Sequence, residues 1–552
     1  MRHFLWDGPY QARDLAGIGL SGNDLSGGDF TMQNLVGAGF VGSTLINADF
    51  TQANLTNAGF HQARLTGANF TGAIVGGADF TDYGAGGISQ AQLYATASYH
   101  ARDLAGIVLD GNDLPGADFA GQNLTGADFQ VVRMPNADFR SANLVGADFY
   151  GSSVENANLS QANLMNASLD YAWLTGADFT GAIIRGADFT RQADPLGDYG
   201  SGLSVAQLQS TSSYQAGDLR AVNLAGSNLA GANLVGQDLT DANFGRGLGA
   251  DAADLTSANL AQANLTNAQL QYVNLANTNL SEADLSHANL RQANLSGAVL
   301  SGTNISGVDF SHNHNSEALT LAQLYSTVTY QNGDLSGIKL GGFDLSGAVF
   351  SGKNLSHATF ADPALGSSNL AGANFSRANL AQVVFANANL ANADLSHANL
   401  EGAQLGFRDF FYGGANLTGA DLSHTNLSNA HLAGLLVFDE FGEAFLYPGA
   451  DLTGANLSAA DTRGADFQLA TLTGAITTHL IQTNGHVASL GYLTGDNVGG
   501  FHAGIWSEGS GDLALVARKG DVAPGTDANL RYDEVFSPVL NNSGRTLFSV
   551  HH

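Results

Sequence analysis

Residues 45–70 read LINADFTQANLTNAGFHQARLTGANF, with Leu or Phe at every fifth position. A period of five does not fit an α-helix, in which residues five apart point about 140° away from each other, and it does not fit a flat strand, in which they alternate between faces. These side chains can face one core only if the chain bends once in each repeat. The pattern therefore predicts a coil wound around a central core.

A coil of this kind has no internal partners for its backbone N–H and C=O groups, so neighbouring coils must supply them. Repeats of one length stacked in register are typical of a solenoid. The recurring order is Ala, then Asp or Asn, then Leu or Phe, followed by Ser or Thr and often Gly. This order resembles the pentapeptide repeat proteins over roughly four-fifths of the chain. The resemblance implies an all-β fold, a right-handed quadrilateral β-helix with four pentapeptides in each coil, whose Leu, Phe and small residues face inward.

Leu and Phe also alternate along the repeats, as at Leu45, Phe50, Leu55 and Phe60. If four repeats close a coil, alternate repeats lie on opposite faces. Two opposite walls of the core would then be lined by Phe and the other two by Leu. We interpret the Phe residues as core, without a role in ligand binding.

Three copies of one segment interrupt the repeats, at residues 89–104, 204–219 and 320–335. Each begins with Ser or Thr in a helix N-cap position and continues with apolar residues at helical spacing. We predict a short amphipathic helix in each, which either caps an open coil end or acts as a hinge between rods. The predicted organisation is four β-helix blocks joined by short helices, namely block 1 at 1–80, a linker at 81–100, block 2 at 101–190, a linker at 191–216, block 3 at 217–310, a linker at 311–332, block 4 at 333–478 with an extruded loop near 435–448, and a small β-rich C-terminal domain at 479–552.

The C-terminal segment alternates apolar and polar residues around Gly-rich turns, which predicts β-hairpins. Its stretch GIWSE…LALVARKGDVAPG resembles a β-repeat of bacterial secreted and surface proteins of the planctomycete type. The chain has no signal-peptide pattern and no run of about 18 apolar residues, so we expect no membrane span. Residues 10–15 match residues 99–104, as if the sequence began partway through a larger unit. A surface or secreted location is expected if an export signal has been lost, and a cytoplasmic one otherwise.

The formal net charge is −29, and the chain contains no Cys, which excludes disulfides and thiolate chemistry. The acidic residues favour the position just before the core residue. Since positions twenty apart share a face, they predict two candidate interaction stripes on opposite faces. One stripe comprises Asp118, Asp138 and Asp178, and the other comprises Asp128, Asp148 and Asp188.

An acidic rod favours a non-catalytic structural or protein-interaction scaffold with an unknown protein partner. The pentapeptide repeat family includes quinolone-resistance proteins, so the resemblance implies a first alternative, a DNA mimic that binds a DNA-handling enzyme such as gyrase. The C-terminal resemblance implies a second, an envelope-associated binding module. Direct nucleic-acid binding is not expected, because the chain has no basic stripe. The rod could also associate end to end.

We expect no enzyme activity, cofactor or metal site, because the chain has no P-loop, no GxSxG elbow and no Cys nucleophile. His287, His357, His397 and His424 share one outward slot of the repeat, and His357 and His397, forty residues apart, would lie two coils apart on one face, too far for a shared metal ion. The extruded loop offers an aromatic and acidic candidate contact patch, unless it folds back onto its own rod. The patch comprises Phe438, Asp439, Glu440, Phe441, Glu443, Phe445 and Tyr447.

Overall fold

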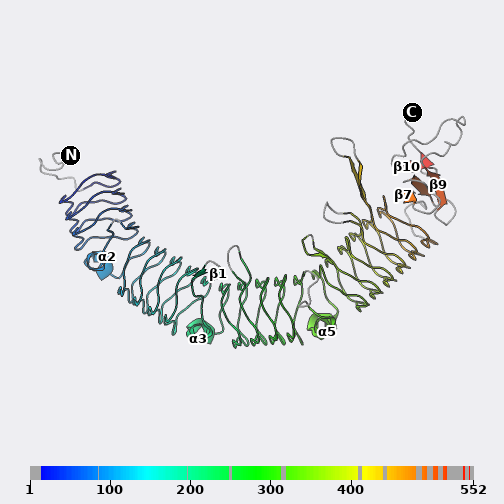
Figure 1. The fold of residues 1–552 in the computed structure, drawn as a ribbon, viewed down its shortest axis with the longest axis horizontal. Helices are drawn as coiled ribbons and strands as arrows, with labels where there is room; N and C mark the ends of the chain where they lie inside the picture. The colour runs from blue at the N-terminus through cyan, green and yellow to red at the C-terminus, as the bar shows by residue number, and fades with distance from the viewer. Residues whose placement is uncertain are drawn as a thin grey trace. The chain divides into compact units, whose positions relative to one another are not determined.

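The structure is a computed structural model of the chain. It describes residues 14–479, except Ala85, 195–196, 248–250, 313–318, Pro363, 408–412 and 439–443, and the strands that follow residue 479. The chain forms two units, Met1–Thr278 and Asn279–His552, and each is described by itself. Both units contain stacked coils, as Figure 1 shows.

Backbone bridges join residues twenty positions apart wherever the repeats are uninterrupted. In the first unit, Asn34 pairs in parallel with Asn54, and Asp49 pairs with Asn69. The Phe50 N–H donates to the Asn69 carbonyl at 2.8 Å, and the Asn69 N–H donates to the Ala48 carbonyl at 2.9 Å. These bonds run from coil to coil, as a strand-like coil without internal partners requires. The spacing confirms a β-helix with four pentapeptides in each coil.

The chain bends between bridges at tight turns whose third residue has a positive φ. The Ala53 N–H donates to the Phe50 carbonyl at 3.0 Å, and Gln52 between them has a φ of 56°. Gly37 occupies the same position of its turn with a φ of 64°. Glycine suits this position because it lacks the Cβ that disfavours left-handed backbone. This turn is the bend that the five-residue period predicted.

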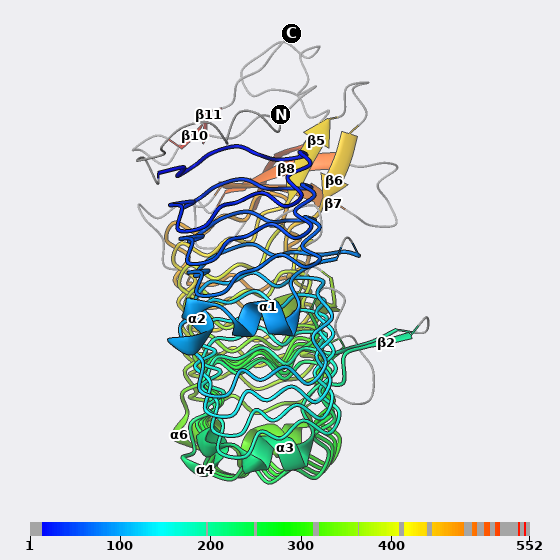
Figure 2. The ribbon, with the colours of Figure 1, turned by 90° about the vertical axis from the view of Figure 1, so that its left-hand side faces the viewer.

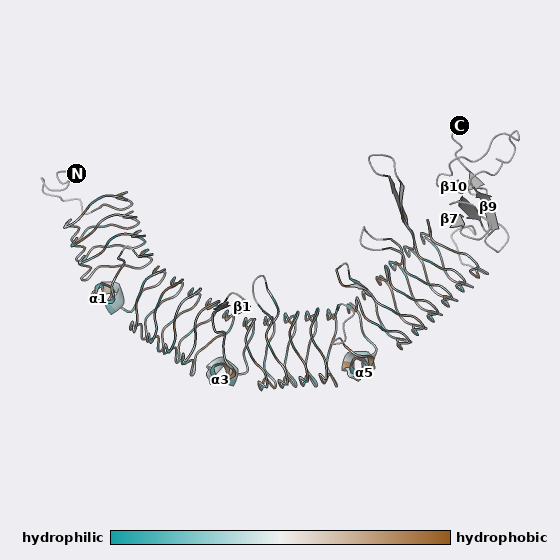
Figure 3. Ribbon diagram, in the orientation of Figure 1, coloured by the Kyte–Doolittle hydropathy of each residue, from teal (hydrophilic) through white to brown (hydrophobic). Residues whose placement is uncertain are grey.

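Phenylalanine rings form two ladders inside the first unit, on opposite walls of the coil. The Phe30 and Phe50 rings stack with centroids 4.9 Å apart, and the Phe40 and Phe60 rings stack at 5.0 Å. The two ladders meet edge to face, since Phe40 and Phe50 are 5.6 Å apart at an interplanar angle of 82°. Polar and apolar residues alternate along the coils (Figure 3), and these rings are fully buried. The geometry confirms the predicted alternation of Phe and Leu walls.

Replacement of Phe50 by Ala should lower the free energy of unfolding by about 3–5 kcal/mol, the usual cost of removing a buried ring. The loss should be local, because each coil contacts only its neighbours, so amide hydrogen exchange should accelerate most in the coils nearest Phe50. Phe50→Leu, which leaves a smaller cavity, should have a smaller effect. Equal exchange in wild type and Phe50→Ala would contradict a core that depends on the ring ladder.

Each interrupting segment holds a pair of short helices where the sequence predicted one. The pairs are α1 (Gln90–Tyr94) with α2 (Ala97–His100), α3 (Val205–Ser210) with α4 (Ser212–Gln215), and α5 (Leu321–Ser326) with α6 (Val328–Asn332). A threonine divides each pair. Thr96, for example, is extended with ψ of 151°, and its side chain accepts the Tyr99 N–H, so it caps the second helix. Figure 2 shows α1 and α2 following one another along one coil.

A glutamine side chain in the first helix of each pair donates hydrogen bonds to backbone carbonyls of the preceding coil, where a strand would otherwise pair. The Gln92 side-chain amide donates to the carbonyls of Leu65 at 2.7 Å and Ala68 at 2.9 Å. Its Oε1 atom accepts the Ser89 N–H and so completes a capping box. Gln207 and Gln323 make the corresponding contacts in the other two pairs.

Tyrosines on the helices contact the following coil. The Tyr99 hydroxyl donates to the Asp118 carbonyl at 3.0 Å, and the Asp118 N–H donates to the Tyr94 hydroxyl at 2.6 Å. Beside the helices, the coils pair directly, with a parallel bridge from Asp79 to Val108. A helix pair therefore forms part of one coil and bonds to the coils on both sides of it. This arrangement differs from both predicted roles, the end cap and the hinge.

Gln92→Glu should destabilise the α1–α2 coil by about 1–3 kcal/mol. Glu can still accept at the capping box, but it cannot donate to the Leu65 and Ala68 carbonyls. Chemical denaturation would measure the loss of stability, and hydrogen exchange of residues 65–68 would show where it occurs. Gln52→Glu, the same change at an exposed turn, is the matched control and should be nearly neutral. A similar loss in both variants would show that added charge, and not the missing donors, causes the effect.

Among the described residues, short antiparallel hairpins leave the coils at three places. They are β1 (Gln192–Asp194) with β2 (Gly197–Tyr199), β3 (Ala361–Asp362) with β4 (Gly366–Ser367), and β5 (Leu435–Phe438) with β6 (Ala444–Tyr447). Figure 2 shows β5 and β6, and the β2 strand extends outward from its coils. In the C-terminal segment, β7 (Ala488–Leu493), β8 (His502–Ser507) and β9 (Ala514–Arg518) form an antiparallel sheet, and β10 (Val539–Leu540) pairs with β11 (Thr546–Leu547).

Candidate interaction faces

The six Asp residues of the predicted stripes all cap turns of the coil. The Asp128 carboxylate accepts the Gln130 N–H at 2.9 Å, and the Asp138 carboxylate accepts the Arg140 N–H at 3.0 Å. Asp118, Asp148, Asp178 and Asp188 accept the N–H of the second following residue in the same way. This Asx turn explains why Asp or Asn precedes the core residue. Turn chemistry alone therefore accounts for the position of the acids, but it does not require their charge.

The structure places the two predicted stripes in register along opposite faces of the first unit. Bridges join Asp118 to Asp138 and continue through Asn158 to Asp178. We call this set the first column. Other bridges join Asp128 to Asp148 and continue through Ser168 to Asp188, and we call that set the second column.

The first column is partly neutralised by a basic side chain. The Arg140 guanidinium forms a bidentate contact with Asp138, with Nη2 to Oδ2 at 2.7 Å and Nε to Oδ1 at 3.2 Å. The hydrogen bond from Arg140 lowers the pKa of the Asp138 carboxyl below its ordinary value. The Asp138 charge is therefore already matched within the chain.

The second column is joined by acids that the sequence analysis did not single out. Asp79 precedes it through the bridge to Val108, while Asp110 and Asp170 lie at the adjoining corner of the coil. Burial raises the pKa of Asp128, and repulsion from Asp148, Asp110 and Asp79 raises it further. Burial, with repulsion from Asp188 and Asp148, likewise raises the pKa of Asp170. These carboxylates are therefore close enough to repel one another.

Aromatic and apolar side chains line the same corner. Tyr83, Val131 and Tyr150 are 59%, 54% and 43% exposed, and the Tyr150 and Tyr171 rings meet edge to face at 5.5 Å. The Tyr83 hydroxyl donates to Asp110, which raises the pKa of the tyrosine to about 12. We call this surface the acidic ridge, defined by Asp79, Asp110, Asp128, Asp148, Asp170 and Asp188 with Tyr83, Val131, Tyr150 and Tyr171.

The sequence analysis missed the corner residues because it followed only the residue before the core position. They could have been found by comparing the residues that lie two positions after the residue before the core position, at intervals of twenty along the chain. Asp110, Gln130, Tyr150, Asp170 and Thr190 occupy that series. Three residues of the ridge, Asp110, Tyr150 and Asp170, therefore follow from the same register argument applied to the turns.

The structure describes only part of the predicted loop patch. Phe438 and Phe445 lie in β5 and β6. Tyr447 packs against Phe407, with ring centroids 4.8 Å apart, so the base of the hairpin is anchored to its coil. Asp439, Glu440, Phe441 and Glu443 lie outside the described residues. The patch as a contact surface stays a prediction.

The expected alignment of His357 with His397 is wrong. The β3–β4 hairpin adds five residues to one coil, so Asn354 pairs with Asn379. His357 consequently lies next to Gln382, whereas the His397 ring stacks on the His424 ring at 4.7 Å. Within the described residues, no group of three or more His, Asp or Glu residues could hold a metal ion.

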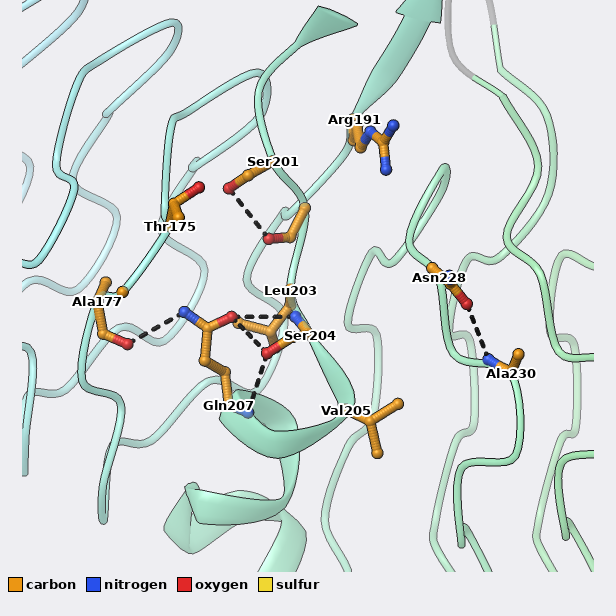
Figure 4. A pocket seen from close by; sticks show the side chains of 12 residues that line it. Thr175, Ala177, Arg191, Ser201, Leu203, Ser204, Val205, Gln207, Asn228 and Ala230 are labelled. Atoms are coloured by element: carbon orange, nitrogen blue, oxygen red, sulfur yellow. Dashed lines mark hydrogen bonds between the residues drawn. The ribbon is translucent and has the colours of Figure 1, made fainter.

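A cleft of about 670 Å³ lies beside α3 in the first unit. Its lining includes Val205, the first residue of α3, whereas the first residue of α1, Gln90, donates to the Pro115 carbonyl at 2.7 Å. Figure 4 shows that Gln207 and Ser204 in this cleft bond to each other and to backbone. These polar side chains are thus used by the helix cap, and we assign the cleft no ligand.

The model of the family described as pentapeptide repeats matches segments that together cover more than half of the sequence. These segments are 34–72, 43–82, 103–140, 132–161, 142–181, 162–191, 218–246, 251–286, 278–312, 368–405 and 413–435. The chain belongs to the pentapeptide repeat family, as its sequence pattern and its coils indicate. The fold of this family is a right-handed β-helix. Residues 447–552 match a family of unknown function, so the resemblance of this segment to bacterial surface proteins stays a prediction.

Several solved structures are similar to the chain. HetL, a pentapeptide repeat protein involved in heterocyst differentiation regulation in the cyanobacterium Nostoc sp. strain PCC 7120, is 19% identical over 72% of this chain and 97% of its own, with a TM-score of 0.12. QnrB1, a plasmid-mediated fluoroquinolone resistance protein, is 18% identical over 45% of this chain and 90% of its own, with a TM-score of 0.13. A pentapeptide repeat protein of the Arabidopsis thaliana thylakoid lumen is 28% identical over 26% and 69%, with a TM-score of 0.11.

Because these TM-scores are below 0.5, the alignments do not establish a similar overall shape. No curated protein sequence matched the chain. Neither family match indicates a catalytic family. None of the helices in the described part of the chain has the length and hydrophobicity needed to cross a bilayer.

Asp128→Asn should raise stability at pH 7 by up to about 1 kcal/mol, because Asn preserves the turn acceptor and removes a partly buried charge and its repulsion from neighbouring carboxylates. The folded state raises the Asp128 pKa above 3.8, so ionisation costs stability as the pH rises through that pKa, and the gain should vanish near pH 3. Asp138→Asn should do the opposite. Its pKa is lowered, so its charge stabilises the fold above pH 3.8 and this contribution is lost as the pH falls.

Thermal unfolding of wild type and both variants at pH 3, 5 and 7 would measure these effects. The two variants carry the same chemical change at equivalent turns on opposite faces, so each controls for the other. A change of the same sign in both at pH 7 would contradict the difference between the two columns.

Proposed function

We propose that this protein is a non-catalytic scaffold that binds other proteins through the outer faces of its coils. The observation that carries the proposal is the pair of in-register Asp columns in the first unit, one of which forms no salt bridge among the described residues. Leu, Phe and Ala fill the interior of the coils, so only the outer side chains can contact a partner. Register fixes these side chains at a regular spacing along each face.

The outward position of the column acids also favours a scaffold over an enzyme. The acids lie on outward faces, where water has access, and each is used by a turn. General acid or base catalysis needs a group that is shielded and positioned against a substrate. A pKa raised mainly by partial burial and by like charges on an open face does not supply that setting.

DNA mimicry is the second candidate function. Stacked Phe rings one coil apart are about 5 Å apart, so carboxylates in one column repeat at a similar distance. A DNA strand carries one phosphate per about 3.4 Å of helix axis, so the linear charge density is comparable in order of magnitude. The contact between Arg140 and Asp138 weakens one of the two faces and favours a one-sided surface over a duplex-like one. An envelope-associated binding module is a third candidate, which depends on the resemblance of the C-terminal segment.

Affinity capture from a bacterial lysate with the full chain as bait would test the scaffold. We expect a partner that elutes with salt and re-forms a complex of fixed stoichiometry when purified, as measured by light scattering. Duplex DNA should not displace it. Displacement of a DNA-handling enzyme such as gyrase by duplex DNA would favour mimicry instead, and turnover of a substrate by the purified chain would contradict a non-catalytic role.

A further inference from the structure

The acidic ridge combines carboxylates with exposed aromatic rings on one face of the first unit. Among the described residues, none of its six Asp side chains forms a salt bridge. The Oδ1 atom of Asp110 is buried and has no hydrogen-bond partner within the described residues. A buried carboxylate oxygen without a donor is costly, and a bound donor or cation would offset that cost.

Elsewhere, the chain shows which side chain fits such positions. Where Arg lies two residues after a turn Asp, its guanidinium hydrogen-bonds to the carboxylate of that Asp. Arg140 does so with Asp138, and Arg220 does so with Asp218. The corresponding ridge positions after Asp128 and Asp148 hold Gln130 and Tyr150. Gln130 donates from its side-chain amide to the Asp148 Oδ2 atom at 2.9 Å, and Asn223 donates to the Asp188 Oδ2 atom at 3.0 Å, so neutral donors stand where other coils have a guanidinium and the carboxylate charge is not matched.

The tyrosines have a similar internal precedent. Arg246 lies over the Tyr272 ring, with its guanidinium carbon 5.9 Å from the ring centroid. Tyr272 occupies the corner position that Tyr171 occupies on the ridge, as the bridges from Asp188 through Asn223 and Asn243 to Gln269 show. Guanidinium stacks on aromatic rings and pairs with carboxylates through two parallel bonds, which an ammonium cannot do.

We infer that the acidic ridge binds an extended, arginine-rich segment of a partner protein that runs across successive coils. This inference rests on the proposed protein-binding function. A segment in the extended polyproline II conformation has three residues per turn and advances about 3.1 Å per residue, so side chains three residues apart share a face and are about two coils apart. Arg side chains at that spacing would reach the Asp148 and Asp188 levels in turn, and the rings of Tyr150 and Tyr171 between them would support the guanidinium planes. Arg191, at the corner after Tyr171, ends the ridge.

The test uses the full chain and two fluorescent peptides of equal length and charge, one with Arg and one with Lys at every third position and Ser elsewhere. Binding is measured by fluorescence anisotropy at about 50 mM and 150 mM salt. The ridge variant is Asp128→Asn with Asp148→Asn. The matched control is Asp118→Asn with Asp178→Asn, which makes the same charge change at equivalent turns on the opposite face. Tyr171→Asn removes a ring and places there a residue that the chain often uses at this positive-φ position.

We expect the Arg peptide to bind at least fivefold more tightly than the Lys peptide. The ridge variant should weaken Arg-peptide binding at least fivefold and Tyr171→Asn about threefold, whereas the control should change it less than twofold. Equal weakening by the ridge and control variants, or equal binding of the two peptides, would overturn the inference in favour of general charge attraction. Circular dichroism of each variant would confirm that the coils remain folded.

The lysate experiment separates this inference from the proposed function. A captured partner whose binding is unaffected by the ridge variant, together with no peptide binding, would leave the scaffold standing and reject the ridge as its Arg-binding face. If no partner is captured but the Arg peptide binds selectively, the result would count against the proposed scaffold and would retain the ridge as an Arg-binding face.

Discussion

The structure depends on backbone hydrogen bonds that no coil can make within itself. Each coil bonds to the coils before and after it, as Phe50 does to Asn69, so register is the constraint that every other feature must respect. The Phe ladders, the Asp columns and the Asn side chains all repeat at the coil spacing because the backbone does. An insertion that breaks register must therefore satisfy the bonds of both neighbouring coils or leave the stack.

The five-residue period predicted the coil, because the core residues can all face inward only if the chain bends once in each repeat. The four sides followed from the resemblance to the pentapeptide repeat proteins, and the alternating walls followed from the four sides. The sequence also predicted the two Asp columns, since register follows from counting in twenties. It did not predict that Arg140 neutralises one column or that Asp110 and Tyr83 join the other. Those contacts depend on side chains at turns, where length, direction and neighbouring charge decide the partner, and the repeat pattern carries no information on them.

The histidine prediction failed for an instructive reason. Counting residues assumes that every coil has the same length, and the β3–β4 hairpin changes one of them. His357 then falls beside Gln382, not above His397. The apolar residues around Thr96 and its equivalents recur at helical spacing and so predict one helix, whereas the extended backbone of these threonines divides it into two. Short irregular elements are thus set by local capping, which competes closely with helix continuation.

The helix pairs have a consequence for how such a chain can change in length. Gln92 bonds backward to one coil and Tyr99 bonds forward to the next, so the pair is a self-contained joint with strand-like hydrogen bonding on both sides. Gene duplication could add or remove whole coils between two joints, in steps of twenty residues, without exposing an unpaired edge. A protein engineer could use the same joint as a splice point, and set the reach of each segment by the number of coils.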